Sequence, residues 1–158
     1  MKNLLPRKMV TASFASCLFA VAYALFNPDP LNTEMGSYLY RVWLIIPAYL
    51  LYALPIMFTF GIAASLASQW ITRKFLSHLL TAEVQQTAAL LTLHVIFGSV
   101  FLYAGLLGAL IFFVLDFLFA RRGAVYTYKH AMISLLGPFG LFALLIITYW
   151  LSDLTQSL

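Results

Sequence analysis

The chain has 158 residues, of which 63% are hydrophobic and 9% charged, and its formal net charge is +4. A soluble domain carries about a quarter charged residues, so this composition excludes an ordinary soluble domain. The Lys and Arg residues stand in small groups beside apolar runs, which is typical of membrane topology signals rather than of nucleic-acid binding.

Three uncharged runs predict membrane-spanning helices. They extend from Val42 to Thr72, from Val84 to Leu115 and from His130 to Ser152. Each is longer than the roughly 20 residues that a helix needs to cross the hydrocarbon core of a bilayer. We therefore expect one integral membrane domain, residues 1–158, with an all-α fold.

The first predicted span covers residues 9–26 and ends at Asn27-Pro28-Asp29-Pro30, where two prolines stop the helix. The basic residues before it and the small-x-small pattern of Ala22-Tyr23-Ala24 also resemble a cleaved secretory signal. We expect the span to be retained, because the rest of the chain is itself embedded in the membrane. The lone Cys17 is interpreted as a packing residue; a lipoprotein processing site at this position is the weaker alternative.

The second predicted span covers residues 42–67 and contains Pro47 and Pro55, each of which should kink the helix. Small residues then recur along one side of its second half, and such residues allow helices to approach closely in lipid. The predicted helix-packing face consists of Gly61, Ala64, Ser65 and Ser68.

A polar segment, residues 68–86, follows. We expect a loop and then an amphipathic turn or two at the membrane interface. Arg73 and Lys74 in this segment are predicted to be cytoplasmic basic anchors.

The next apolar stretch has two possible threadings. It can form two spans, 87–104 and 106–120, with a tight turn near Gly105–Gly108, or one long third helix. Two spans make five in all and place every Lys and Arg except Arg41 on one side of the membrane, if the N-terminus is cytoplasmic. A single helix divides them almost evenly. Because cytoplasmic loops are rich in Lys and Arg, we predict five spans, with four as the alternative.

The last predicted span covers residues 131–151 and is interrupted by Gly137-Pro138. The loop before it carries Arg121 and Arg122, which the five-span threading makes cytoplasmic anchors.

Two ionisable side chains, His94 and Asp116, lie inside predicted spans. Such groups are costly in lipid and are candidate functional residues. In the five-span threading they lie at similar depth on successive helices and can form a hydrogen-bonded polar pair. This pair is either part of a proton-linked polar path or, as we expect, a buried contact that fixes helix packing.

The sequence contains no catalytic arrangement of the Ser-x-x-Lys, Gly-x-Ser-x-Gly or His-Glu-x-x-His type, and its histidines do not have the spacing of a metal site. We therefore expect no catalytic residues, no bound metal and no cofactor.

Three segments together resemble a known family. They are Leu54-Pro55-Ile56 leading through Phe60–Ser65 to Ile71–Lys74, then Leu93–Gly98, and then Gly108–Asp116 followed by Arg121-Arg122. Their order resembles a family of small, uncharacterised multispan membrane proteins of Bacillus-type bacteria, over about half of the chain. The resemblance implies a membrane architecture and no particular mechanism.

From these patterns we expect a multi-pass cell-membrane protein with a cytoplasmic N-terminus. Its expected role is non-enzymatic: an accessory or immunity-like subunit that acts through helix–helix contacts with the bilayer, a second copy or a membrane-protein partner. The alternative is a small oligomeric transporter or channel component with a polar path at His94 and Asp116. An enzyme acting on lipid is a third possibility that lacks a catalytic set.

Overall fold

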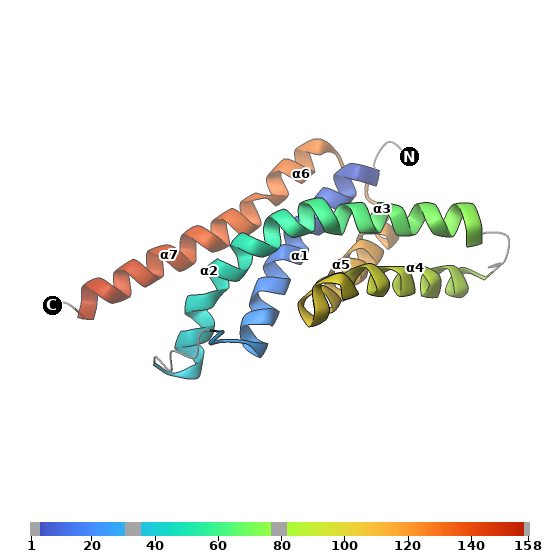
Figure 1. Cartoon of the computed structure of the whole chain (residues 1–158). Coiled ribbons are helices and arrows are strands. Elements are labelled where there is room, and N and C mark those ends of the chain that lie inside the picture. Colours follow the sequence, from blue (N-terminus) through green and yellow to red (C-terminus); the bar gives the residue numbers. More distant parts are fainter. Residues whose placement is uncertain (1–3, 31–35, 77–81, 157–158) are drawn as a thin grey trace.

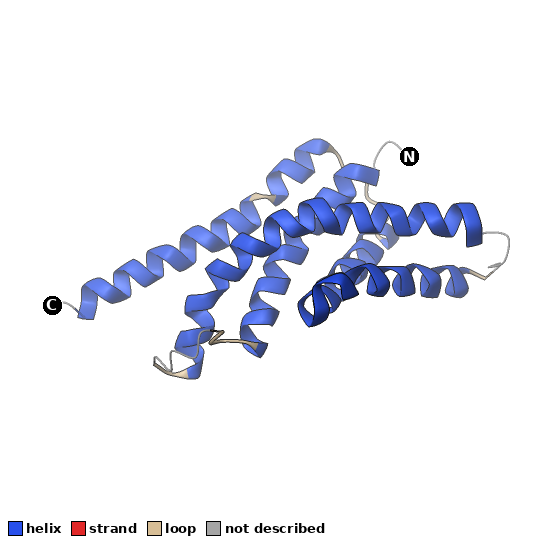
Figure 2. Ribbon diagram, viewed as in Figure 1, coloured by secondary structure: helices blue, strands red, loops and turns tan. Residues whose placement is uncertain are grey.

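The computed structural model describes residues 4–30, 36–76 and 82–156, and all regular secondary structure in these ranges is helical (Figure 2). The expected all-α fold is confirmed. Four helical segments are long and apolar enough to cross a membrane: Leu4–Phe26, Tyr38–Leu76, Glu83–Arg121 and Tyr128–Leu151. The individual elements are α1 (Leu4–Phe26), α2 (Tyr38–Ile56), η1 (Met57–Gly61), α3 (Ile62–Ile71), η2 (Thr72–Leu76), α4 (Glu83–Gly98), η3 (Ser99–Phe101), α5 (Leu102–Arg121), α6 (Tyr128–Ser134) and α7 (Leu136–Gln156).

Helix α1 is the central helix of the bundle and packs against α2, α5, α6 and α7 (Figure 1). Small residues on it allow this close packing, and Ala12, Ala15, Ala20 and Ala24 are fully buried. The helix begins at Leu4, earlier than the predicted start at residue 9, because Pro6 lies in its first turn, where proline is tolerated. Arg7 and Lys8 therefore lie inside the helix.

Elements α2, η1, α3 and η2 form one continuous helical rod (Figure 1). A wide π-helical turn, η1, follows Pro55, and the Thr59 hydroxyl donates to the Pro55 carbonyl at 2.7 Å. The rod extends to Leu76, past the predicted end of the span at residue 67, so the first part of the expected polar loop is helical. Within it, the Ser68 and Thr72 hydroxyls donate to carbonyls one turn back, which satisfies these polar groups inside the helix. The rest of the predicted amphipathic segment up to residue 81 lies outside the described residues.

Helices α4 and α5 fold back on each other as a hairpin. The chain turns at η3 and Leu102, whose φ is 55°, and not at Gly105–Gly108 as predicted. The glycines instead let the two helices touch: a Cβ on Gly98 would lie 2.5 Å from the Ala109 Cβ and 2.7 Å from the Gly105 carbonyl oxygen. Glu83–Arg121 is therefore not one straight helix, although taken as a whole it has the length and hydropathy of one of four spans. The bundle accordingly has four or five spans.

The last segment is interrupted at Leu135, between α6 and α7, slightly before the predicted interruption at Gly137-Pro138. Pro138 explains the position, because proline cannot donate to the carbonyl four residues earlier, that of Ser134, and its ring crowds that carbonyl. Helix α7 then packs on α2, where the Trp43 indole N–H donates to the Thr148 hydroxyl at 3.2 Å.

Candidate functional site

A cluster of charged and polar side chains joins α1, α3 and α5 in the interior of the bundle. The Lys8 ammonium lies 2.6 Å from one carboxylate oxygen of Asp116 and also donates to the Ser65 hydroxyl. The Arg7 guanidinium donates to the other carboxylate oxygen at 3.2 Å. The Gln69 amide, on α3, completes the set at 3.4 Å from Asp116. We call these five residues the ion cluster.

Lys8, Ser65 and Asp116 of the ion cluster are buried, whereas Arg7 and Gln69 are partly exposed. Lys8 is 0% exposed and Asp116 8% exposed. A charge in such a position is stable only when it is paired and hydrogen-bonded, and each oxygen of Asp116 has its own cation. The cluster therefore ties three helices together through one carboxylate.

The structure does not join His94 to Asp116, and the predicted hydrogen bond between them is wrong. The His94 Nδ1 lies 2.8 Å from the Leu90 carbonyl oxygen, and the ring packs edge-on against Phe113, with ring centres 5.4 Å apart. His94 Nε2 has no hydrogen-bond partner among the described residues. Asp116 instead forms ion pairs with Arg7 and Lys8, because both residues lie within α1 and their side chains contact the carboxylate.

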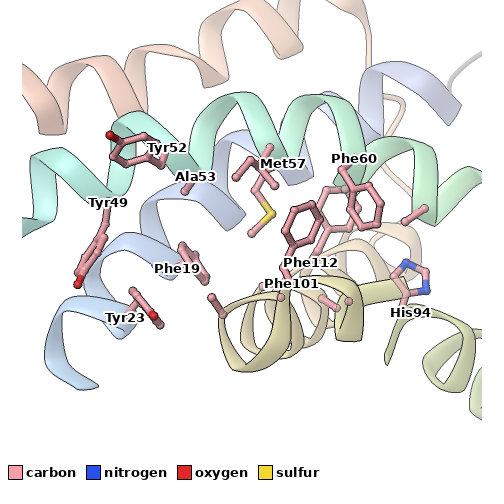
Figure 3. Close-up of a pocket in the computed structure, with 18 residues that line it drawn as sticks. Phe19, Tyr23, Tyr49, Tyr52, Ala53, Met57, Phe60, His94, Phe101 and Phe112 are labelled. Carbon is pink, nitrogen blue, oxygen red and sulfur yellow. The ribbon is translucent and has the colours of Figure 1, made fainter. Parts of the chain in front are cut away.

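Beside the ion cluster lies a cavity of about 330 Å³ between α1, the η1 region of the long rod and the α4–α5 hairpin. Its walls are mainly apolar and aromatic, including Phe19, Met57, Phe60 and Phe112. Figure 3 shows Tyr23 and Tyr49 at one end of the cavity and His94 at the other.

The four residues of the predicted helix-packing face have different surroundings. A Cβ on Gly61 would lie 3.1 Å from the Phe112 ring, and Ala64 lines the cavity. Ser65 accepts from Lys8, and Ser68 is fully buried. This face of the rod is therefore directed toward α1 and α5.

The predicted basic anchors are exposed. The Lys74 ammonium lies 4.8 Å from the centre of the Trp70 ring, and the Arg121 guanidinium lies 4.5 Å from the centre of the Phe117 ring. Arg73 and Arg122 lie at the ends of the same two helical segments, η2 and α5.

Sequence reasoning missed Arg7, Lys8 and Gln69 as partners of Asp116. The sequence did contain one signal for Lys8. A row of small residues follows it at helical spacing, so these residues share one face of the helix with Lys8, and that face is buried: Thr11, Ala12 and Ala15. That row of small residues would have placed Lys8 inside the bundle.

Among the described residues, no group of three His, Cys, Asp or Glu side chains could hold a metal ion. Comparisons of the chain with models of protein families, with curated proteins and with solved structures give no match. The resemblance to a family of small multispan membrane proteins therefore stays a prediction.

Proposed function

We propose that this chain is a non-enzymatic integral membrane protein that acts through contacts between helices, as an accessory or immunity-like subunit of the cell membrane. The observation that carries the proposal is the Lys8–Asp116 ion pair. The buried charges of Lys8 and Asp116 are paired with each other, and this is the chemistry of a packing element. The apolar outer sides of the helices are then available to lipid and to a partner helix.

The arrangement of basic residues supports a cytoplasmic N-terminus. The ion cluster brings the beginning of α1, the C-terminal part of α3 and the C-terminal part of α5 to the same end of the bundle. Arg73, Lys74, Arg121 and Arg122 follow these segments along the chain. Basic residues gathered at one end favour the cytoplasmic side for that end.

The second candidate is a small oligomeric transporter or channel component. It is favoured by His94, a buried histidine with an unpartnered nitrogen beside a cavity. Against it stand the apolar walls of that cavity and the absence of Asp116 from its lining residues. A path for protons would need polar groups or water along its length.

Two measurements on the full chain distinguish the two candidate functions. Purified protein in liposomes with a pH-sensitive dye inside reports proton flux under an imposed pH gradient. In-membrane chemical cross-linking of the tagged protein, followed by mass spectrometry, reports its partners. We expect dye traces equal to those of empty liposomes, and a cross-linked product that contains a second copy or another membrane protein.

A His94→Leu variant, folded as judged by its circular dichroism, serves as the comparison for the flux measurement, because His94 lines the cavity and Asp116 does not. Proton flux through the wild type that this variant abolishes would overturn the accessory role and support the transporter. Recovery of only uncross-linked monomer at several cross-linker lengths would also overturn the accessory role.

A further inference from the structure

The cavity between α1, η1 and the α4–α5 hairpin has the size of a ligand site. Its volume, about 330 Å³, falls within the range of about 300–1,000 Å³ that small-molecule pockets occupy. The π-helical turn after Pro55 supplies one wall through Met57 and Phe60, and α5 supplies the opposite wall through Gly108 and Phe112. The absence of a side chain at Gly108 leaves space, because a Cβ there would lie 2.8 Å from the end of Met57.

Water is a poor occupant of this cavity. A buried water needs two to four polar partners, whereas the walls are formed mainly by carbon atoms. The Tyr49 hydroxyl at one end donates to the Asn27 carbonyl at 2.8 Å. The cavity is therefore suited to a hydrocarbon.

The His94 ring at the other end of the cavity carries a polar atom, Nε2, for which the described residues provide no hydrogen-bond partner. His94 is 4% exposed, and its ring stands at the end of the cavity (Figure 3). Its Nδ1 faces the Leu90 carbonyl, which can only accept, so Nδ1 carries the hydrogen. An imidazolium in these apolar walls would be costly, so the ring is neutral and Nε2 is an acceptor. This acceptor has no partner among the described residues, and an unmet buried acceptor is itself unfavourable.

The mouth of the cavity indicates where an occupant comes from. Tyr52, Ile56 and Phe101 line the cavity and are also among the exposed large hydrophobic side chains. They belong to segments long and apolar enough to lie within a bilayer. An opening with an apolar rim inside the bilayer admits a membrane lipid more readily than a water-soluble molecule.

We propose that this cavity binds a long-chain lipid alcohol from the bilayer. The hydrocarbon chain lies among Phe19, Met57, Phe60 and Phe112, and the hydroxyl donates a hydrogen bond to His94 Nε2. The site fixes the orientation of the lipid through this polar contact at one end, as apolar pockets with a few placed polar groups do.

The test uses two probes of equal chain length on the purified full chain in nanodiscs: a diazirine-labelled long-chain primary alcohol and its methyl ether, which has no hydrogen to donate. We expect ultraviolet light to attach the alcohol to residues of the cavity. The ether should label about fivefold to tenfold more weakly at equal concentration, the range set by one lost hydrogen bond.

Two variants, each with a matched control, separate the polar contact from the cavity. His94→Leu should remove the difference between alcohol and ether, whereas His130→Leu, a change of an exposed histidine on α6, should preserve it. Ala104→Phe should fill the cavity and abolish labelling by both probes. Leu110→Phe, at an exposed α5 position outside the lining, should not.

Equal labelling of the wild type by alcohol and ether would overturn the proposed role of His94. Labelling that persists at the same residues in a folded Ala104→Phe variant would overturn the cavity as the binding site. Covalent dimers formed through a photoreactive residue at Tyr52, in place of lipid adducts, would assign the cavity to a second copy and also overturn the proposal.

Discussion

Lys8 and Asp116 are separated by 108 positions in the chain, yet their charged atoms lie 2.6 Å apart in the interior of the bundle. The contact joins α1, the central helix, to α5, the second arm of the hairpin. Asp116 can reach α1 in this way because the chain turns back at residues 99–102, and Lys8 can reach Asp116 because α1 begins before it. The ion pair thus depends on two features that sequence patterns describe poorly, namely the position of this turn and the start of α1.

The turn between α4 and α5 is tested by Leu102→Gly. Leu102 has φ 55° and ψ −140°, a conformation that favours glycine, and its side chain is exposed. The substitution should raise the free energy of unfolding by about 1–3 kcal/mol through relief of backbone strain. Unfolding in mixed detergent micelles measures it.

Leu110→Gly, in the middle of α5, is the control for this turn and should lower stability by about 1 kcal/mol, as glycine does inside a helix. If Leu102→Gly lowers stability by the same amount, residue 102 lies within a continuous helix and the hairpin is wrong.

The contact between η1 and α5 is tested by Gly61→Leu. A Cβ at Gly61 already lies 3.1 Å and 3.2 Å from two atoms of the Phe112 ring, so a leucine must push the helices apart. Overpacking of this kind should lower the melting temperature, corresponding to a loss of about 1–3 kcal/mol.

Gly140→Leu on α7 is a matched control for Gly61→Leu, because a Cβ at Gly140 has no atom within 4 Å. Its melting temperature should be equal to or slightly above that of the wild type, because leucine favours a helix more than glycine does. Equal melting curves for both variants would mean that Gly61 faces lipid and not Phe112.

The apolar runs predicted the helical architecture well because hydropathy depends on composition over many residues, and packing does not change it. Local boundaries depend on tertiary contacts and were predicted less well. The turn was expected at Gly105, yet glycine serves there for the close approach of Gly98 on the facing helix. In this turn the residue with positive φ is Leu102, and a leucine gives no sequence signal for a turn.

The candidate site was predicted in part. The prediction that Asp116 is a costly carboxylate inside the bundle agrees with its burial. The predicted partner was His94, because His94 is the other ionisable residue inside the predicted spans and lies at a similar depth. Lys8 was counted as a flanking charge that orients the first span. The structure buries it, because a row of small residues on the same face of α1 brings that face into the interior.

The orientation of the chain is tested by cysteine labelling in intact cells, in a Cys17→Ala background. Ala124→Cys lies in the exposed segment after α5, beside Arg121 and Arg122. Ala124 is preferable to Gly123, whose φ of +64° disfavours a side chain. A membrane-impermeant maleimide added outside should leave Ala124→Cys unlabelled, because the positive-inside rule places this segment in the cytoplasm.

Pro30→Cys, in the segment between α1 and α2, is the companion position and should be labelled from outside. Labelling of Ala124→Cys together with protection of Pro30→Cys would show the opposite orientation.

The central claim, that the bundle is fixed by the Lys8–Asp116 ion pair, is tested most directly by a double-mutant cycle on unfolding in mixed micelles. Asp116→Leu should lower the free energy of unfolding by about 3 kcal/mol, because it leaves the buried Lys8 ammonium without a counter-charge. Lys8→Met should lower it by less, because Asp116 keeps its ion pair with Arg7. The double variant should lose less than the sum by more than about 1 kcal/mol. Lys129→Met, at an exposed lysine of α6, should change little and add independently to Asp116→Leu. Losses at Lys8 and Asp116 that are additive within about 0.5 kcal/mol would contradict the account.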